Sequence, residues 1–183
     1  DPATKDLNTV RDSGMTVRRG SGMLQFFILA YAALIGFSSH ASDTSVSGGV
    51  TFDAIGRPSM LKIRGQGKQV RGTLKQDGMN LSGEFVAKLD DLDTGMKLRN
   101  EHMKTKYLEV AQFPESKFKL EVLSLPSSEG EFKGLPFRGA LTIRGVEKTI
   151  SGTADLTVSK TVQHISAAFV ARISDFGMQI PSF

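Results

Sequence analysis

The sequence contains no cysteine and only three histidines. The absence of cysteine excludes disulfide and thiol chemistry, so an exported domain with this sequence would depend on its packed core alone. One histidine, His40, lies in an N-terminal segment that is interpreted below as a signal. The other two, His102 and His164, have no second histidine or carboxylate at a ligand spacing such as i, i+4. We therefore expect no metal site.

The chain also lacks a strong excess of charge, with a formal net charge of +4. Its basic residues are spread along alternating segments, which is typical of a solvated outer face and gives no reason to expect a nucleic-acid partner. No linker-like run divides residues 42–183. We therefore expect this part of the chain to form one domain.

The main apolar run lies near the N-terminus. Arg18 and Arg19 precede an apolar stretch over residues 24–37, which is shorter than the ~20 residues that a spanning helix needs. Small residues then occupy the −3 and −1 positions of a cleavage site after Ala41. Residues 1–41 are interpreted as upstream residues plus a secretory signal peptide, so a periplasmic location and no stable membrane span are predicted.

From residue 46 onward the dominant sequence period is two, which is typical of antiparallel strands with one face in water. The turn residues Gln76-Asp77-Gly78 and Arg144-Gly145 predict tight hairpins, whereas Gly65-Gln66-Gly67 is interpreted as a turn between two strands. The expected strands lie at 48–54, 60–64, 69–76, 81–89, 117–122, 137–144, 149–158 and 162–173.

One segment departs from this pattern. Residues 95–109 carry apolar side chains at helical spacings, with Thr94 as the expected N-cap and Pro114 beyond the helix end. The chain is thus predicted to be all-β with one short helix. A closed barrel and a two-sheet sandwich both fit the pattern.

The residues around the predicted helix resemble the YceI-like family. The chain supplies, in the order of the family pattern, Asp93-Thr94-Gly95, Leu98-Arg99-Asn100, His102-Met103, Tyr107 and Phe113-Pro114. The resemblance covers roughly Val50 to the C-terminus. It implies an extended antiparallel lipocalin-like β-barrel with a long apolar cavity, and it implies a polyisoprenoid ligand such as a polyprenyl phosphate or a quinone.

Two departures from the family pattern stand out. Many members carry an arginine where this chain has Ile173, with Arg172 next to it. Relatives also continue past a Pro-Ser-aromatic segment into one more strand, whereas this sequence stops at Phe183. The domain at 42–183 is therefore expected to lack its last strand, which would leave a barrel edge unpaired and favour a homodimer.

The apolar faces of the strands have two interpretations: the packed core of a filled barrel, or the lining of a cavity. Small residues on the same faces, such as Gly139 and Gly152, favour the cavity, because a filled barrel needs bulk at inward positions. The resemblance favours it further. The predicted ligand-binding residues on these faces are Phe85, Phe118, Phe137, Leu141, Ile143, Leu156 and Phe169.

Arg99 and His102 are three residues apart on the predicted helix and can face one region, where they would meet a polar head group. Alternatively, Arg99 pairs with a carboxylate such as Asp93 and holds the helix on the barrel.

The predicted function is a binding or carrier protein for a polyisoprenoid or another long-chain lipid. The chain is not expected to be an enzyme, and it carries no dinucleotide, phosphate-loop or serine-nucleophile motif that would call for a cofactor. Two alternatives stay open: a hydrolase that uses His102 or His164, and a filled structural barrel without ligand.

Overall fold

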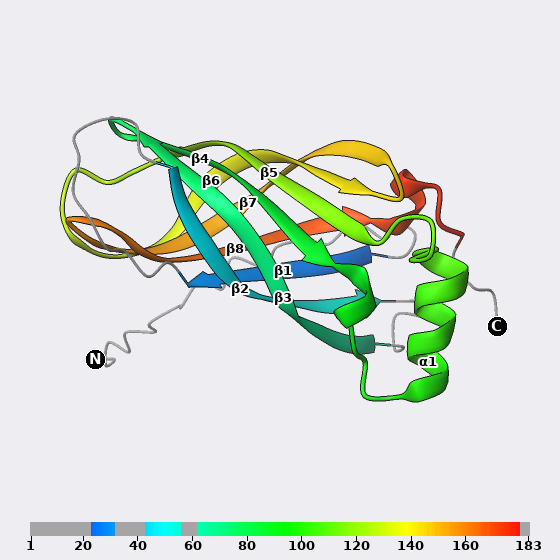
Figure 1. Cartoon of the computed structure of the whole chain (residues 1–183). Helices are drawn as coiled ribbons and strands as arrows, with labels where there is room; N and C mark the ends of the chain where they lie inside the picture. The colour runs from blue at the N-terminus through cyan, green and yellow to red at the C-terminus, as the bar shows by residue number, and fades with distance from the viewer. Residues whose placement is uncertain (1–22, 32–42, 56–61, 180–183) are drawn as a thin grey trace, which may run out of the picture.

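The computed structural model describes residues 23–31, 43–55 and 62–179. Its eight strands are antiparallel and follow one another in sequence order around a closed barrel (Figure 1). This confirms the predicted all-β, lipocalin-like fold. The strands are β1 (Met23–Tyr31), β2 (Asp43–Ile55), β3 (Lys62–Asp77), β4 (Asn80–Lys88), β5 (Glu115–Ser124), β6 (Gly130–Ile143), β7 (Val146–Ser159) and β8 (Thr161–Arg172).

Short helical elements gather at one end of the barrel (Figure 1). They are the 3-10 turns η1 (Leu89–Asp91) and η3 (Ile173–Phe176), the helix α1 (Lys97–His102), and the π-helical turn η2 (Met103–Tyr107) that continues it. The predicted helix is therefore present, but its expected N-cap is wrong. Met96 occupies that position, because the backbone N–H and the hydroxyl of Thr94 both donate to Asn100 Oδ1, at 2.8 and 2.7 Å.

Both predicted hairpins form. Gly78 in the β3–β4 turn has φ +58°, and Arg144 and Gly145 in the β6–β7 turn have φ +53° and +72°, as tight hairpin turns require.

The turn predicted at Gly65–Gly67 is wrong, because β3 runs through it as a single strand. Gly65 pairs with Phe52 of β2, and a Cβ on Gly65 would lie 2.2 Å from the Phe52 ring. The glycine here makes room for a neighbouring ring rather than for a change of chain direction.

Strand β1 lies inside the segment that the sequence predicts as a signal peptide. It pairs with β2 from Met23↔Ile55 to Tyr31↔Ser47 and with β8 from Met23↔Arg172 to Tyr31↔His164. β1 thus closes the seam between β2 and β8. The barrel edge that the sequence predicts to be unpaired is covered by β1 in the chain as given. The other residues of the predicted signal, its cleavage site and residues 180–183 lie outside the described residues.

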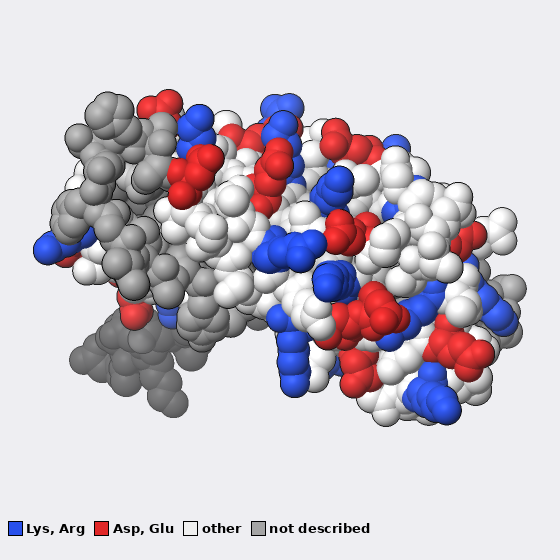
Figure 2. Space-filling model, viewed as in Figure 1, with Lys and Arg blue, Asp and Glu red and all other residues white. Residues whose placement is uncertain are grey.

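The core is one continuous apolar cluster that runs through the barrel and under the helical end. Outside, lysines and arginines are interspersed with aspartates and glutamates on the face in Figure 2. This agrees with the solvated outer face expected from the sequence. Within the described ranges, no helix has both the length and the apolar character needed to cross a membrane.

Candidate functional site

Four phenylalanine rings from different strands meet inside the barrel. Phe85 of β4 lies opposite Phe118 of β5 in the strand register, and their rings stack at 5.8 Å between centroids. Phe118 also stacks on Phe169 of β8 at 5.4 Å and meets Phe137 of β6 edge-on at 5.7 Å. All four side chains are 3–4% exposed. Phe118 therefore sits at the centre of an aromatic cluster that reaches from β4 to β8.

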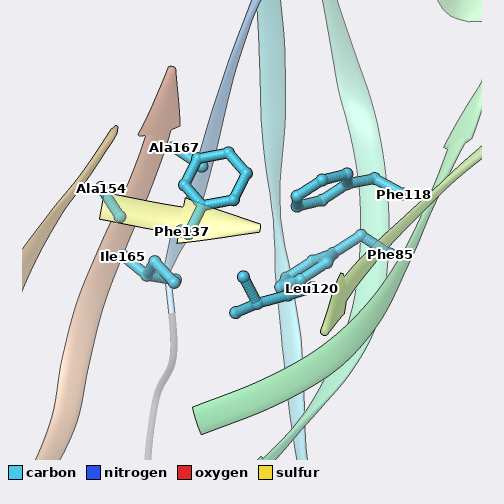
Figure 3. A pocket seen from close by; sticks show the side chains of 7 residues that line it. All are labelled: Phe85, Phe118, Leu120, Phe137, Ala154, Ile165 and Ala167. Atoms are coloured by element: carbon cyan, nitrogen blue, oxygen red, sulfur yellow. The ribbon is translucent and has the colours of Figure 1, made fainter. Parts of the chain in front are cut away.

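Two small cavities flank this cluster, and Phe85 and Phe118 form part of the wall of both. Figure 3 shows the first, of about 10 Å³, which is lined by Phe85, Phe118, Leu120, Phe137, Ala154, Ile165 and Ala167. The second, of about 30 Å³, extends toward the helical end and is lined by Val50, Val70, Phe85, Ala87, Leu89, Leu92, Ser116, Phe118, Leu141 and Phe169. Spaces of this size hold a water molecule or two. Neither of these two cavities therefore holds a lipid chain in this conformation.

The seven predicted lining residues of the strands are all buried. Five of them border one or both cavities, whereas Ile143 and Leu156 lie in the core without bordering either. Sequence reasoning missed Leu120 and Ser116 as lining residues, although both share the period-two face of Phe118. Ser116 is the one polar side chain among these lining residues, and its hydroxyl donates to the Thr142 carbonyl at 2.9 Å.

At Gly152, a ring of the neighbouring strand occupies the space beside the glycine. Gly152 pairs with Phe137 in the β6–β7 register, and a Cβ at Gly152 would lie 2.9 Å from the Phe137 ring. The ring lies across the bare backbone of the neighbouring strand and uses the space that a side chain would take. At this position the small residue accommodates a ring of the neighbouring strand, and the predicted cavity as a whole stays a prediction.

At the helical end, Asp93 is held by Asn100 rather than by Arg99. Asn100 Nδ2 and the Gly95 N–H donate to Asp93 Oδ1 at 2.7 and 2.8 Å, and these two hydrogen bonds, Asn100 first, lower the pKa of Asp93 below its ordinary 3.8. The Arg99 guanidinium instead contacts Met96 Sδ. The expected Arg99–Asp93 pair is wrong, because the Asp93 carboxylate accepts a hydrogen bond from Asn100 instead.

A reciprocal backbone pair ties this segment to the barrel: the Gln66 N–H donates to the Asp93 carbonyl at 2.9 Å, and the Asp93 N–H donates to the Gln66 carbonyl at 2.8 Å. Arg99 and His102 are both half-buried on α1. A contact between either residue and a lipid head group stays a prediction.

The two histidines proposed for a hydrolase lie at opposite ends of the barrel. His102 is on α1, whereas His164 is near the start of β8. The opposite end of β8 leads into η3, and the carbonyl of Gly177, just after η3, accepts a hydrogen bond from Arg144. Arg144 also binds Glu109, just after η2. These contacts place the end of β8, and not its start, beside the helical elements. Among the described residues, no group of three or more His, Cys, Asp or Glu side chains could hold a metal ion.

Comparisons with known proteins place the chain in a family. Among solved structures, it is similar to a polyisoprenoid binding domain from Saccharophagus degradans, implicated in plant cell wall breakdown, with a TM-score of 0.46 and 12% identity over 81% of this chain and 91% of that chain. It is also similar to BcnA from Burkholderia cenocepacia, with a TM-score of 0.43 and 13% identity over 82% of this chain and 96% of that chain. The search of curated proteins returned no match. The family model of the YceI-like domain matches residues 39–182, and the chain therefore belongs to the YceI-like family.

Proposed function

We propose that the barrel binds the apolar chain of a polyisoprenoid, or of a similar amphiphilic lipid, and carries it in the periplasm after export. The observation that carries this proposal is the chemistry of the interior. The cavity linings are apolar except for Ser116, whose hydroxyl already donates to Thr142. Such a lining stabilises hydrocarbon and offers little to a polar group.

The energy for binding would come from apolar burial, at about 0.8 kcal/mol for each CH₂ removed from water. A charged or hydroxylated head group would stay at a mouth of the barrel, because its burial without partners costs several kcal/mol. Arg99 and His102 on α1 are the proposed contacts for a head group at the helical end. The choice of an isoprenoid follows from membership of the YceI-like family.

Entry of a lipid chain into either of these two cavities must displace side chains. The larger cavity, of about 30 Å³, is far below the roughly 300 Å³ of a small-molecule site. The same observation favours the second candidate function, a structural barrel whose interior is simply filled. The two candidates differ in whether the phenylalanine rings can move aside.

The deciding experiment is mass spectrometry of the organic extract from the protein as it is purified after expression in a Gram-negative host. A carrier retains an isoprenoid lipid at close to one molecule per protein. Absence of extractable lipid, together with no binding of added farnesol by the folded protein, would leave the filled barrel as the function. Fractionation of the same cells tests export: mature protein that begins near Ser42 is expected in the periplasm, and an uncleaved cytoplasmic product contradicts it.

A matched pair of variants locates the binding face. Phe137→Asp places a charge among buried apolar side chains and should abolish lipid retention. Val122→Asp places the same carboxylate on an exposed side chain of β5, which is 54% accessible, and should leave retention unchanged. Retention by a folded Phe137→Asp protein would show that this face does not line the site.

A further inference from the structure

A short strap, residues 89–93, lies at the helical end of the barrel and joins β4 to the segment that leads into α1. It consists of the 3-10 turn η1 and the two residues that follow it. Its two leucines, Leu89 and Leu92, are each 3% exposed and border the larger cavity. Every other described residue that lines either cavity belongs to a strand. The strap is therefore the part of the cavity wall that lies outside the sheet.

The strap is joined to the sheet by fewer backbone hydrogen bonds than a strand is. Each strand of the closed barrel pairs with a neighbour on both sides, so a strand residue can move outward only if a ladder breaks. Among the described residues, the strap makes one β-bridge to a strand, in which Gln66 and Asp93 exchange hydrogen bonds of 2.9 and 2.8 Å. The Leu89 N–H also donates to the Pro114 carbonyl at 2.9 Å, just before β5. The strap can therefore leave the wall without breaking a strand ladder, as expected of a segment that opens locally.

Side chains of the strap hold it closed against β3. Asp91 Oδ2 accepts hydrogen bonds from the backbone N–H of Lys68 and, at 2.9 Å, from that of Gln69. Leu92 lies over the bare backbone of Gly67, where a Cβ would be 2.9 Å from Leu92 Cδ2. Hydrogen bonds to a charged acceptor contribute more to stability than neutral ones. Three consecutive residues of β3 thus bind one polar and one apolar side chain of the strap, and the strap stays closed without ligand.

From these contacts we infer that the strap is a lid through which a lipid chain enters and leaves the barrel, an inference that rests on the proposed lipid-binding function. Both cavities are too small for such a chain, so part of the wall must move before it can enter. Release of the strap withdraws Leu89 and Leu92 from the wall and uncovers the interior beside Phe85 and Phe118. Those rings then repack around the entering chain. The helix α1, which carries the proposed head-group contacts, follows the strap in the sequence.

A reversible cross-link tests the lid, because the chain has no cysteine of its own. Gln66 and Asp93 are exposed and lie opposite each other in the bridge. Residues paired in this way have Cα atoms about 5.5 Å apart, a separation that suits a disulfide. Gln66→Cys with Asp93→Cys, called the strap pair, therefore locks the strap to β3 when oxidised. The control pair is Lys75→Cys with Ser82→Cys, which are opposite residues of β3 and β4 near the hairpin, at the other end of β4 from the strap.

The measurement is the rate at which the purified protein takes up tritiated geranylgeraniol, followed by rapid gel filtration. The lipid is added after oxidation with oxidised glutathione, and the same protein reduced with dithiothreitol is the reference. Oxidation of the strap pair should slow uptake about tenfold or more, because the lid can then no longer open, and reduction should restore the rate. Oxidation of the control pair should leave the rate unchanged. Each cysteine protein is compared with its own reduced form, so the loss of the Asp93 carboxylate does not enter the comparison.

A weakened closure should have the opposite effect on the rate. Asp91→Ala removes the acceptor for the Lys68 and Gln69 N–H groups and should speed uptake about fivefold. Asp155→Ala is the matched control, because this carboxylate also accepts a backbone hydrogen bond, from the Gly134 N–H at 2.8 Å, but lies on β7. Its uptake rate should equal that of the wild type.

The outcomes separate the lid from the lipid-binding function. The lid is supported if oxidation slows uptake in the strap pair alone and if Asp91→Ala, but not Asp155→Ala, speeds it. Equal rates in the oxidised and reduced strap pair overturn the lid, and so does an equal slowing by the control cross-link. Both of these results leave lipid binding intact. If the wild type and the folded variants bind no geranylgeraniol at all, the lipid-binding function fails and the lid fails with it.

Discussion

Glu109 and Arg144 form an ion pair that contains two hydrogen bonds, and both residues have a positive φ. Arg144 Nη2 and Nε donate to Glu109 Oε2 at 2.5 and 3.0 Å, and the φ values of the two residues are +49° and +53°. Neither residue is a glycine, so both conformations carry a conformational cost. Arg144 Nη1 also donates to the Gly177 carbonyl at 3.0 Å. One side chain thus joins the end of the helical segment, the β6–β7 hairpin and the turn after η3.

Loss of this junction should destabilise the helical end of the barrel. We expect Arg144→Ala to lower the free energy of unfolding by about 1–3 kcal/mol, because charge-assisted hydrogen bonds of a partly buried group are lost. Urea unfolding at neutral pH measures the change. The matched control is Arg138→Ala, which removes an arginine that is 69% exposed and lies 3.4 Å from Glu121, and its effect should stay within about 0.5–1 kcal/mol. Equal effects of the two substitutions would contradict the special role of Arg144.

The stability of the protein in the acid range, below about pH 4, should depend on Asp93. The hydrogen bonds from Asn100 and from the Gly95 N–H lower the pKa of this carboxyl from its ordinary 3.8 in the folded protein. A lowered folded-state pKa contributes stability that is fully present above the unfolded pKa and is lost as the pH falls through the folded one. The contribution of Asp93 should therefore disappear as the pH is lowered from about 4.

Thermal melting from pH 6 down to pH 2 tests this expectation. Asp93→Asn should show a shallower loss of melting temperature below about pH 4 than the wild type. Asn100→Ala removes the main donor and should move the carboxyl pKa of Asp93 back up toward 3.8, which NMR titration of the side-chain carbon can follow. If the Asp93→Asn protein loses melting temperature as steeply as the wild type below about pH 4, the Asp93 carboxylate does not contribute to the stability in this way.

The sequence predicted the strand faces and the hairpins well, because local rules decide them, whereas the choice of a barrel came from the family resemblance. Period-two alternation puts Phe85, Phe118 and Phe137 on inward faces whatever their partners are, and the structure confirms that they are buried. The hairpins at Gly78 and Arg144-Gly145 follow from residues that adopt positive φ at low cost. These features depend on a few neighbouring residues only.

The errors concern contacts that the local sequence pattern does not determine. A pair of glycines has the same local pattern in a turn as in a strand that accommodates a ring, so only Phe52 on β2 reveals why β3 continues through Gly65. The occupation of the interior depends on how the rings of Phe118 and Phe169 stack across the barrel, which alternation does not encode. Likewise, Asn100 and Arg99 both lie within reach of Asp93 by spacing, and only the geometry of the helix start selects Asn100.

The last prediction concerns β1, which occupies the seam between β2 and β8 within the predicted signal segment. Removal of residues 1–41 would take away the partners of β2 from Ser47 to Ile55 and of β8 from His164 to Arg172. The uncovered N–H and C=O groups would form two sheet edges ready to pair with another chain. We therefore expect a chain that begins at Ser42 to melt at a lower temperature than the full chain and to associate into homodimers or larger species as its concentration rises. Light scattering after size-exclusion chromatography, with a chain that lacks only residues 1–22 as the control, measures both effects. A monomeric, equally stable protein from Ser42 onward would show that β1 is dispensable and that the remaining strands close the seam without it.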